Sequence, residues 1–335
     1  MTEKHPNQKK KRRKLNLHRV IPWALGLLIF IAILASVIQL LKWNRGKEYV
    51  IDPNVDVDTE TEDMIFFMDP SMLPENNYDG TLDVVILGND TLVYQDDSSS
   101  IGNLLEEKID GNVYNCGFKG SYLAAETKTM EAVADNPIDA FGFFWLSNAI
   151  MTQDWSMQET ALNHLPAEYD KQEYQETLSL LKSLDFNTID LLLIYYDGHD
   201  YLAKHPMANP NDMYDVMTME GSFTGSFERY PINLPHMQCI FVAPTFCYVI
   251  DENGNKEGCD IANLGHGNLP TCLTTLVIQT NTYEVSYLDN FYGIKINAET
   301  ADQFLLDDGI TPNKEGREMI AERIANCINI RMIKE

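Results

Sequence analysis

The sequence has few basic residues outside its N-terminal end, and this scarcity restricts the partners of the protein. Residues 1–48 contain 11 of the 25 lysines and arginines but only two of the 50 acidic residues. The remaining 14 basic and 48 acidic residues give the rest of the chain a formal charge near −34. A surface with this charge repels the phosphate backbone, so we expect no nucleic-acid partner, whereas acidity alone identifies no metal site.

The chain also lacks the residue spacing of a metal or nucleotide site. Its six cysteines form no C-x-x-C pair, no P-loop is present, and Ala262 stands where a calcium loop starting at Asp251 needs glutamate. We therefore expect no metal and no cofactor. Cys247 and Cys259 flank the turn at residues 251–255, so they either close a hairpin as a disulfide or remain buried thiols.

One long uncharged run lies close to the N-terminus. Residues 20–41 contain no charged side chain, which at about 1.5 Å per residue is enough to cross a hydrocarbon core of about 30 Å. Eight of the 19 preceding residues are basic, against three between residues 42 and 48, so the positive-inside rule places the N-terminus in the cytoplasm. A cleaved signal peptide is the alternative, but no A-x-A pattern precedes Lys42.

These features predict a single-pass protein of the cell membrane with its main domain outside the cytoplasm. Residues 1–19 would form a cytoplasmic tail and residues 20–41 the transmembrane helix. Residues 42–80 contain seven acidic side chains between positions 52 and 69 and no basic residue after Lys47, which favours an extended tether. Residues 81–335 are numerous enough for one domain with a full hydrophobic core.

Short apolar runs in this domain predict buried strands, and helical stretches accompany them. The runs lie at residues 82–88, 112–116, 190–196 and 239–243, and the helical stretches at 100–109, 170–184 and 314–330. Parallel strands joined by helical crossovers require such spacing, so the expected fold class is α/β, a three-layer α/β/α sandwich. Ligands of such sheets bind beyond the carboxyl ends of the strands, which directs attention to residues 88–91, 117–121 and 197–200.

Four segments at these positions resemble, in order, the sequence blocks of the SGNH or GDSL hydrolases, a family of esterases, lipases and carbohydrate deacylases. They read VVILGNDTL at 84–92, VYNCGFKGSYLAA at 113–125, IYYDGHDY at 194–201 and LDDGITPNKEGREMIAERI at 306–324. The resemblance covers residues 82–330 and implies a flavodoxin-like sheet with substrates that carry acyl groups, including envelope glycans.

Most of the residues that carry the chemistry of this family are replaced. Asn89 stands for the aspartate of the first block, Asp90 for its nucleophilic serine, His199 for the oxyanion-hole asparagine and Thr311 for the catalytic histidine, whereas Gly120 and Asp308 are unchanged. The resemblance implies that Gly120, Asn89 and Asp200 contribute to the oxyanion hole or to binding. A serine mechanism needs an imidazole base beside a hydroxyl, and Thr311 cannot supply one. An ionised Asp90 would also oppose the developing oxyanion, so ordinary esterase chemistry is expected to be impaired.

Three functions follow from this pattern. The first is a pseudoenzyme that binds an acylated envelope glycan or supports a membrane-bound acyltransferase. The second is an active esterase or O-acyltransferase with a rearranged site, in which Asp90 or Thr91 is the nucleophile and His199, beside Asp308, is the base. The third is a structural envelope protein whose cleft is filled. The insertion at 201–237 is expected to form a lid or a ligand-contacting loop.

Overall fold

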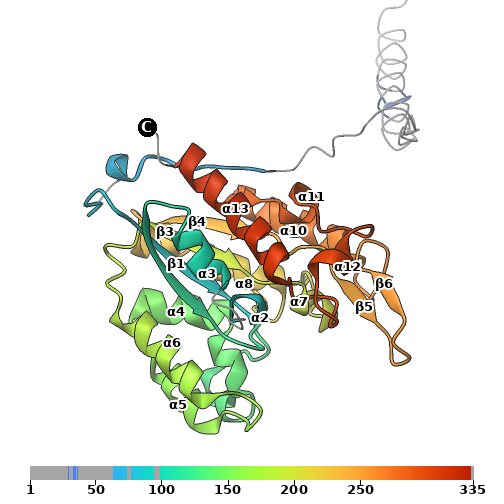
Figure 1. The fold of residues 1–335 in the computed structure, drawn as a ribbon, viewed down its shortest axis with the longest axis horizontal. Coiled ribbons are helices and arrows are strands. Elements are labelled where there is room, and N and C mark those ends of the chain that lie inside the picture. Colours follow the sequence, from blue (N-terminus) through green and yellow to red (C-terminus); the bar gives the residue numbers. More distant parts are fainter. Residues whose placement is uncertain are drawn as a thin grey trace, which may run out of the picture. The chain divides into compact units, whose positions relative to one another are not determined.

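The computed structural model describes residues 63–332, except 74–76 and 94–98, together with residues 29, 33, 34 and 36 (Figure 1). The predicted cytoplasmic tail, most of the predicted transmembrane helix and the first part of the tether lie outside the described residues. Among the residues that are described, no helix is both long and apolar enough to cross a membrane. The described residues from 63 onward belong to one compact unit, which contains the sheet and the helices that pack on it.

A parallel sheet of five strands forms the centre of the unit (Figure 1). In chain order the strands follow the sequence 2-1-3-4-5 across the sheet, which is the flavodoxin-like order of doubly wound folds. They are β1 (Leu82–Gly88), β2 (Gly111–Gly117), β3 (Leu191–Tyr195), β4 (Gln238–Val242) and β7 (Ser286–Leu288), arranged as β2-β1-β3-β4-β7. The predicted α/β class is confirmed, and the four apolar runs coincide with the first four strands.

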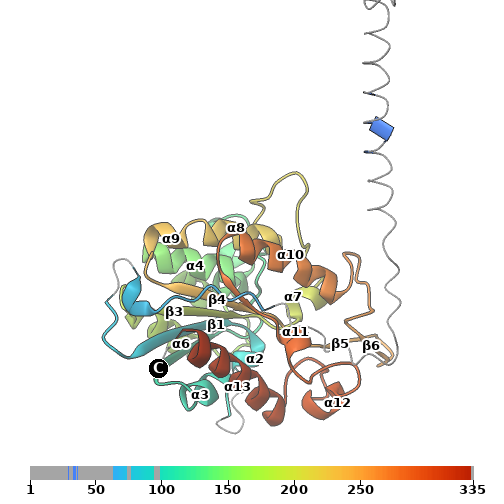
Figure 2. The same ribbon diagram turned by 90° about the horizontal axis from the view of Figure 1, so that it is seen from above.

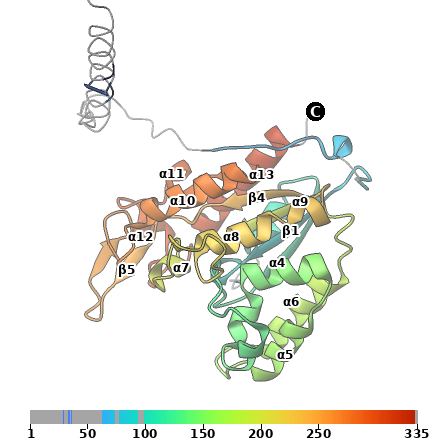
Figure 3. The ribbon, with the colours of Figure 1, turned by 180° about the vertical axis from the view of Figure 1, so that it is seen from behind.

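Helices cover both faces of the sheet and make it the middle layer of three (Figure 2). One face carries α3 (Ile101–Glu106) and α13 (Lys314–Arg331). The opposite face, seen in Figure 3, carries α4 (Phe143–Thr152), α8 (Met219–Phe227) and α10 (Leu269–Thr282). The other elements are α2 (Asp90–Val93), α5 (Ser156–His164), α6 (Lys171–Ser183), α7 (His199–Leu202), α9 (Tyr230–Asn233), α11 (Asn290–Gly293), α12 (Ala301–Phe304), a hairpin of β5 (Tyr248–Ile250) and β6 (Lys256–Gly258), and 3-10 turns at Pro70–Met72, Met130–Ala134 and Pro137–Phe141.

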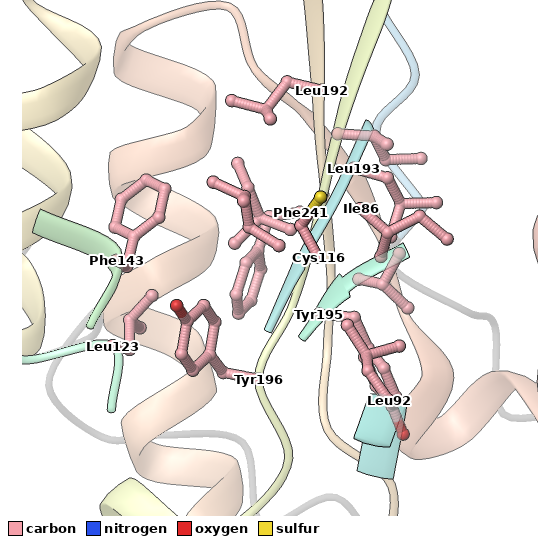
Figure 4. Packing of buried hydrophobic residues seen from close by; sticks show 14 of the residues in the cluster. Ile86, Leu92, Cys116, Leu123, Phe143, Leu192, Leu193, Tyr195, Tyr196 and Phe241 are labelled. Carbon is pink, nitrogen blue, oxygen red and sulfur yellow. The ribbon is translucent and has the colours of Figure 1, made fainter. Parts of the chain in front are cut away.

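The core explains why the strands are continuous apolar runs. All five residues of β3 are fully buried, because a parallel sheet is covered on both of its faces. Successive side chains of the strand therefore enter different layers of the core: Leu192 points toward the side that holds Phe143, and Leu193 lies beside Ile86 on the other (Figure 4). The carboxyl ends of β1, β2 and β3 are thereby fixed at one edge of the sheet.

The insertion at 201–237 is only partly the loop that the sequence predicts. Helix α8 lies within it, and Phe223 and Phe227 are fully or almost fully buried. The ring of Phe223 lies 5.0 Å from that of Phe241 in β4 and 5.7 Å from that of Phe143 in α4, measured between centroids. The expectation of a lid is wrong for this part, because its aromatic side chains complete the core between α4 and the sheet.

The segment 63–73, which we call the strap, runs along the outer edge of β7. Met64 and Tyr287 form an antiparallel bridge with N···O distances of 3.0 and 2.7 Å. Farther along, Phe66 N donates to the Ser286 hydroxyl at 3.0 Å. At the start of the strap, both oxygens of Asp63 lie 2.8 Å from Nη2 of Arg323 in α13. Part of the acidic segment expected to be a tether is therefore bound to the domain.

Candidate functional site

The turn after β1 is joined to the turn after β3 by side-chain hydrogen bonds. Asn89 Nδ2 donates to Asp197 Oδ1 at 2.8 Å, and Asp197 N donates back to Asn89 Oδ1 at 3.0 Å. Thr91 Oγ1 donates to Asp197 Oδ2 at 2.7 Å. Asn89 and Thr91 are fully buried, and β1 and β3 are hydrogen-bonded neighbours, which brings the two turns together. Asn89 and Thr91 thus position the Asp197 carboxylate, and the Thr91 hydroxyl is not exposed to a substrate.

His199 lies at the start of α7 and pairs with the same carboxylate. Its Nδ1 lies 2.6 Å from Asp197 Oδ1, and its backbone N–H donates to that oxygen at 3.1 Å. Burial lowers the pKa of His199, but the charge of Asp197 and the hydrogen bond to it prevail and raise this pKa to about 9. Burial likewise raises the pKa of Asp197, but His199 and Thr91 bring it below its usual value. The pair is therefore an imidazolium and a carboxylate at neutral pH.

Asp90, at the position of the family's serine, occupies the donor that the resemblance assigns to the oxyanion hole. Its Oδ2 accepts a hydrogen bond from Gly120 N at 2.7 Å. Burial and the charge of Asp197 raise the pKa of Asp90, while His199 and the Gly120 N–H act in the opposite direction. Gly120 has a φ of +71°, and a Cβ at this residue would lie 2.8 Å from the hydroxyl of Tyr169. Tyr169 therefore lies against Gly120, whose N–H is already bonded to Asp90, while all three residues remain partly exposed.

Aromatic and charged side chains surround Asp90 and Gly120. The rings of Tyr122 and His205 meet edge to face with centroids 4.4 Å apart, and His205 Nε2 lies 3.7 Å from Glu126 Oε1. Burial, followed by the charge of Glu126, raises the pKa of Tyr122 to about 12. Burial and the charge of Asp90 also raise the pKa of Tyr169. The phenols thus remain neutral donors beside carboxylate acceptors.

Asp200, expected to contribute to binding, instead anchors the chain beneath this region. Its two carboxylate oxygens accept hydrogen bonds from Leu123 N at 2.8 Å and from Ala124 N at 2.9 Å. His205 Nδ1 lies 3.0 Å from one of the same oxygens. Asp200 therefore fixes the segment after β2, on which Gly120 and Tyr122 lie.

In the described contacts, neither site residue of the fourth block is bonded to His199. Asp308 is exposed, and its Oδ1 accepts hydrogen bonds from Ile310 N at 3.0 Å and Thr311 N at 2.9 Å within its own turn. Thr311 is buried, and its carbonyl accepts from Leu306 N. The carboxylate beside His199 is Asp197 instead of Asp308, so the expected pairing of His199 with Asp308 is not formed.

Several residues of the site were not singled out from the sequence. Asp197 falls within the strand-end range 197–200, and its place directly after a buried strand was a usable signal. Tyr122 lies in the second block, where only Gly120 was assigned a role. Tyr169 comes from the loop between α5 and α6, and nothing in the sequence indicates its approach to Gly120. Across the described residues, no group of three or more His, Cys, Asp or Glu is arranged to hold a metal ion.

Comparisons with known proteins yield relatives by structure alone. No family profile matches the sequence, and a search of curated proteins finds no match. Among solved structures, a protein from Lactobacillus plantarum is 14% identical with a TM-score of 0.50, covering 76% of this chain and 99% of its own. A lipase/acylhydrolase from Enterococcus faecalis is 13% identical with a TM-score of 0.40, covering 76% of this chain and 99% of its own. A protein from Bacteroides ovatus described as a GDSL-like lipase is 10% identical with a TM-score of 0.43, covering 75% of this chain and 99% of its own.

The order of the strands and the positions of the sequence blocks identify the fold. All five strands are parallel in the order 2-1-3-4-5. Three of the four blocks span the carboxyl ends of β1, β2 and β3, and the fourth contains the turn before α13 and the first part of that helix, which covers the sheet. The domain has the three-layer fold of the SGNH/GDSL hydrolases.

Proposed function

We propose that this domain binds an acylated glycan at the cell envelope without hydrolysing its ester. The observation that carries the proposal is the hydrogen bond from Gly120 N–H to the Asp90 carboxylate. A tetrahedral intermediate would need this donor for its own negative charge. With an anion already bound there, the oxyanion is opposed both by charge and by the loss of its donor.

The remaining parts of a serine mechanism are also missing from their family positions. The Thr91 hydroxyl is buried and bonded to Asp197, so it is not a nucleophile. Thr311 has no basic nitrogen, and its backbone is held by the Asp308 turn. His199 is protonated at neutral pH because Asp197 raises its pKa, so it does not begin a reaction as a base.

Support for a glycan ligand comes from the chemistry of the same region. Tyr122 and Tyr169 offer neutral hydroxyl groups and ring faces, and Glu126 offers a carboxylate acceptor. Sugars present hydroxyl groups that exchange hydrogen bonds with such side chains, and a few convergent polar groups set the orientation of a ligand. The resemblance supplies the acyl substituent, and the anchor predicted at residues 20–41 supplies the location. A membrane-bound acyltransferase is the partner that this arrangement would serve.

A rearranged esterase is the second candidate, and the contact between His199 and Asp197 favours it. An imidazole oriented by a carboxylate at 2.6 Å is the relay that acyl transfer requires. Asp90 would attack the acyl carbon to form an anhydride while the His199 imidazolium protonates the leaving alkoxide. The neutral His199 would then take a proton from the water that cleaves the anhydride, which restores both side chains.

Hydrolysis of p-nitrophenyl acetate by the purified full-length protein separates the two candidates. We expect no turnover by the natural protein and a gain of turnover in Asp90→Ser/Thr311→His, which restores the family's nucleophile and base. Asp90→Asn is the matched control, because it keeps the shape but supplies neither group. Turnover by the natural protein that His199→Ala abolishes would instead establish the rearranged enzyme.

Binding is measured separately by calorimetry with an O-acetylated oligosaccharide and its deacetylated form. We expect binding of the acetylated form, weakened in Tyr169→Phe, because the phenol hydroxyl lies against Gly120 at the centre of the site. Tyr292→Phe, on an exposed part of α11, is the matched control. If neither sugar binds and the natural protein shows no turnover, the structural role is favoured.

A further inference from the structure

The hairpin between β4 and α10 brings two cysteines face to face at its base. Strands β5 and β6 pair in antiparallel register, with Tyr248 opposite Gly258. The next pair, on the side away from the turn, is Cys247 and Cys259, and Cys259 N donates to Cys247 O at 3.0 Å. Residues directly opposite one another in antiparallel strands have Cα atoms about 4.5–5.5 Å apart. This lies within the range of about 4.4–6.8 Å that a disulfide spans.

The two sulfur atoms also lie on the same side of the hairpin. Cys247 N donates to Cys259 Sγ at 3.2 Å. Both residues are buried, with exposed fractions of 1% and 0%. Both are free thiols in this structure, and the antiparallel pairing of their backbones places them on one face of the hairpin.

The base of this hairpin supports the site. A Cβ added to Gly198 would lie 2.9 Å from Cys247 Sγ, so Cys247 packs directly against the residue between Asp197 and His199. The neighbouring Tyr248 donates its N–H to Gly309 O at 2.8 Å, in the fourth block. The hairpin therefore connects the turn after β3 with the turn before α13.

We propose that Cys247 and Cys259 form a disulfide that locks this hairpin against the third and fourth blocks of the site. The reaction needs an external disulfide, either that of a thiol oxidoreductase or oxidised glutathione. The thiolate of one cysteine attacks this disulfide and forms a mixed disulfide, and one sulfur of the oxidant leaves as a thiolate. The second cysteine then attacks the mixed disulfide and releases the other sulfur. Two electrons pass to the oxidant, and the two thiol protons leave with them.

The bond forms most readily while the chain folds. Hydrogen bonding to Cys259 and burial raise the pKa of Cys247 well above its ordinary value, so the closed hairpin holds little thiolate. In the unfolded or opening hairpin both thiols are exposed to solvent and to the oxidant. The proposal does not depend on the ligand of the site, and failure of the glycan binding test leaves it intact.

The test is peptide mapping of full-length protein that has been refolded with oxidised glutathione. Trypsin cuts after Arg229, Lys256 and Lys295, which places Cys247 and Cys259 in two peptides, 230–256 and 257–295. These peptides also contain Cys239 and Cys272 respectively. We expect the two peptides to stay linked until a reductant is added, and the oxidised protein to show two fewer reactive thiols than the reduced protein.

Two double variants identify the bond. Cys239→Ser/Cys272→Ser retains only the proposed pair in these peptides and should keep the cross-link. Cys247→Ser/Cys259→Ser should lose it. A cross-link that persists in the second variant, or an unchanged thiol count in refolded protein with native circular dichroism, would overturn the proposal. Reduction should also speed hydrogen exchange at Tyr248 N in the natural protein, and an unchanged rate would contradict the role of the bond as a lock.

Discussion

The pair formed by His199 and Asp197 predicts that stability falls as pH rises. Because the folded protein raises the pKa of His199 from 6.5 to about 9, the pair contributes its full stability below pH 6.5. This contribution is lost as the pH passes through about 9, where the folded protein also releases the proton. At about 1.4 kcal/mol per pKa unit, the shift corresponds to a ceiling of about 3 kcal/mol. The side chain is 31% exposed, so screening reduces the expected contribution to about 1–2 kcal/mol.

Urea unfolding of the natural protein and of His199→Gln, followed by circular dichroism across this pH range, measures the effect. The free energies of unfolding should differ by about 1–2 kcal/mol below pH 6.5 and converge above about pH 9. The comparison is needed because hydrogen bonds to Asp200 and Glu126 also outweigh burial and raise the pKa of His205 to about 9, which adds a slope common to both proteins. His164→Gln, at the exposed end of α5, is the control. A difference that stays constant with pH would refute the ion pair.

Three further substitutions test individual contacts. Thr91→Val removes a buried donor to the Asp197 carboxylate and should lower the free energy of unfolding by about 1–3 kcal/mol; an unchanged urea midpoint would mean that water replaces the hydroxyl. Gly120→Ala places a Cβ at a φ of +71° and 2.8 Å from a tyrosine hydroxyl, so it should cost about 1–3 kcal/mol by the same assay, and a neutral result would show that the loop adjusts. Asp63→Ala removes the bridge to Arg323 and should accelerate cleavage of the strap in limited proteolysis, whereas equal rates would assign the strap's attachment to its backbone bonds.

The fold could be predicted wherever a strand is long and buried on both faces. β1, β3 and β4 read as apolar runs for that reason, and helices such as α6 and α13 carry polar residues at their ends. β7 was missed because it has three residues, which is too short for any period to appear. α10 was missed as well, since five threonines interrupt its apolar pattern and threonine is a poor helix former. Both elements owe their structure to packing against their neighbours.

The candidate site was located by the strand-end rule, but its contacts were not. The rule identified Asn89, Asp90 and the range 197–200, since it depends only on the direction of the strands. The strand-end rule does not predict the direction in which each side chain points. Thr91 and Asp90 are adjacent, yet one points to Asp197 and the other to the N–H of Gly120. Such choices depend on residues far apart in the chain, and a single sequence does not record them.

The strap pairs with the edge strand of the sheet, β7. Without Met64 and its neighbours, the outer edge of β7 would offer unpaired N–H and C=O groups to any extended peptide, including a second copy of this protein. The strap therefore covers the exposed edge of the sheet. Proteolysis that removes residues before position 74 would expose this edge, so the strap protects the domain against edge-to-edge aggregation.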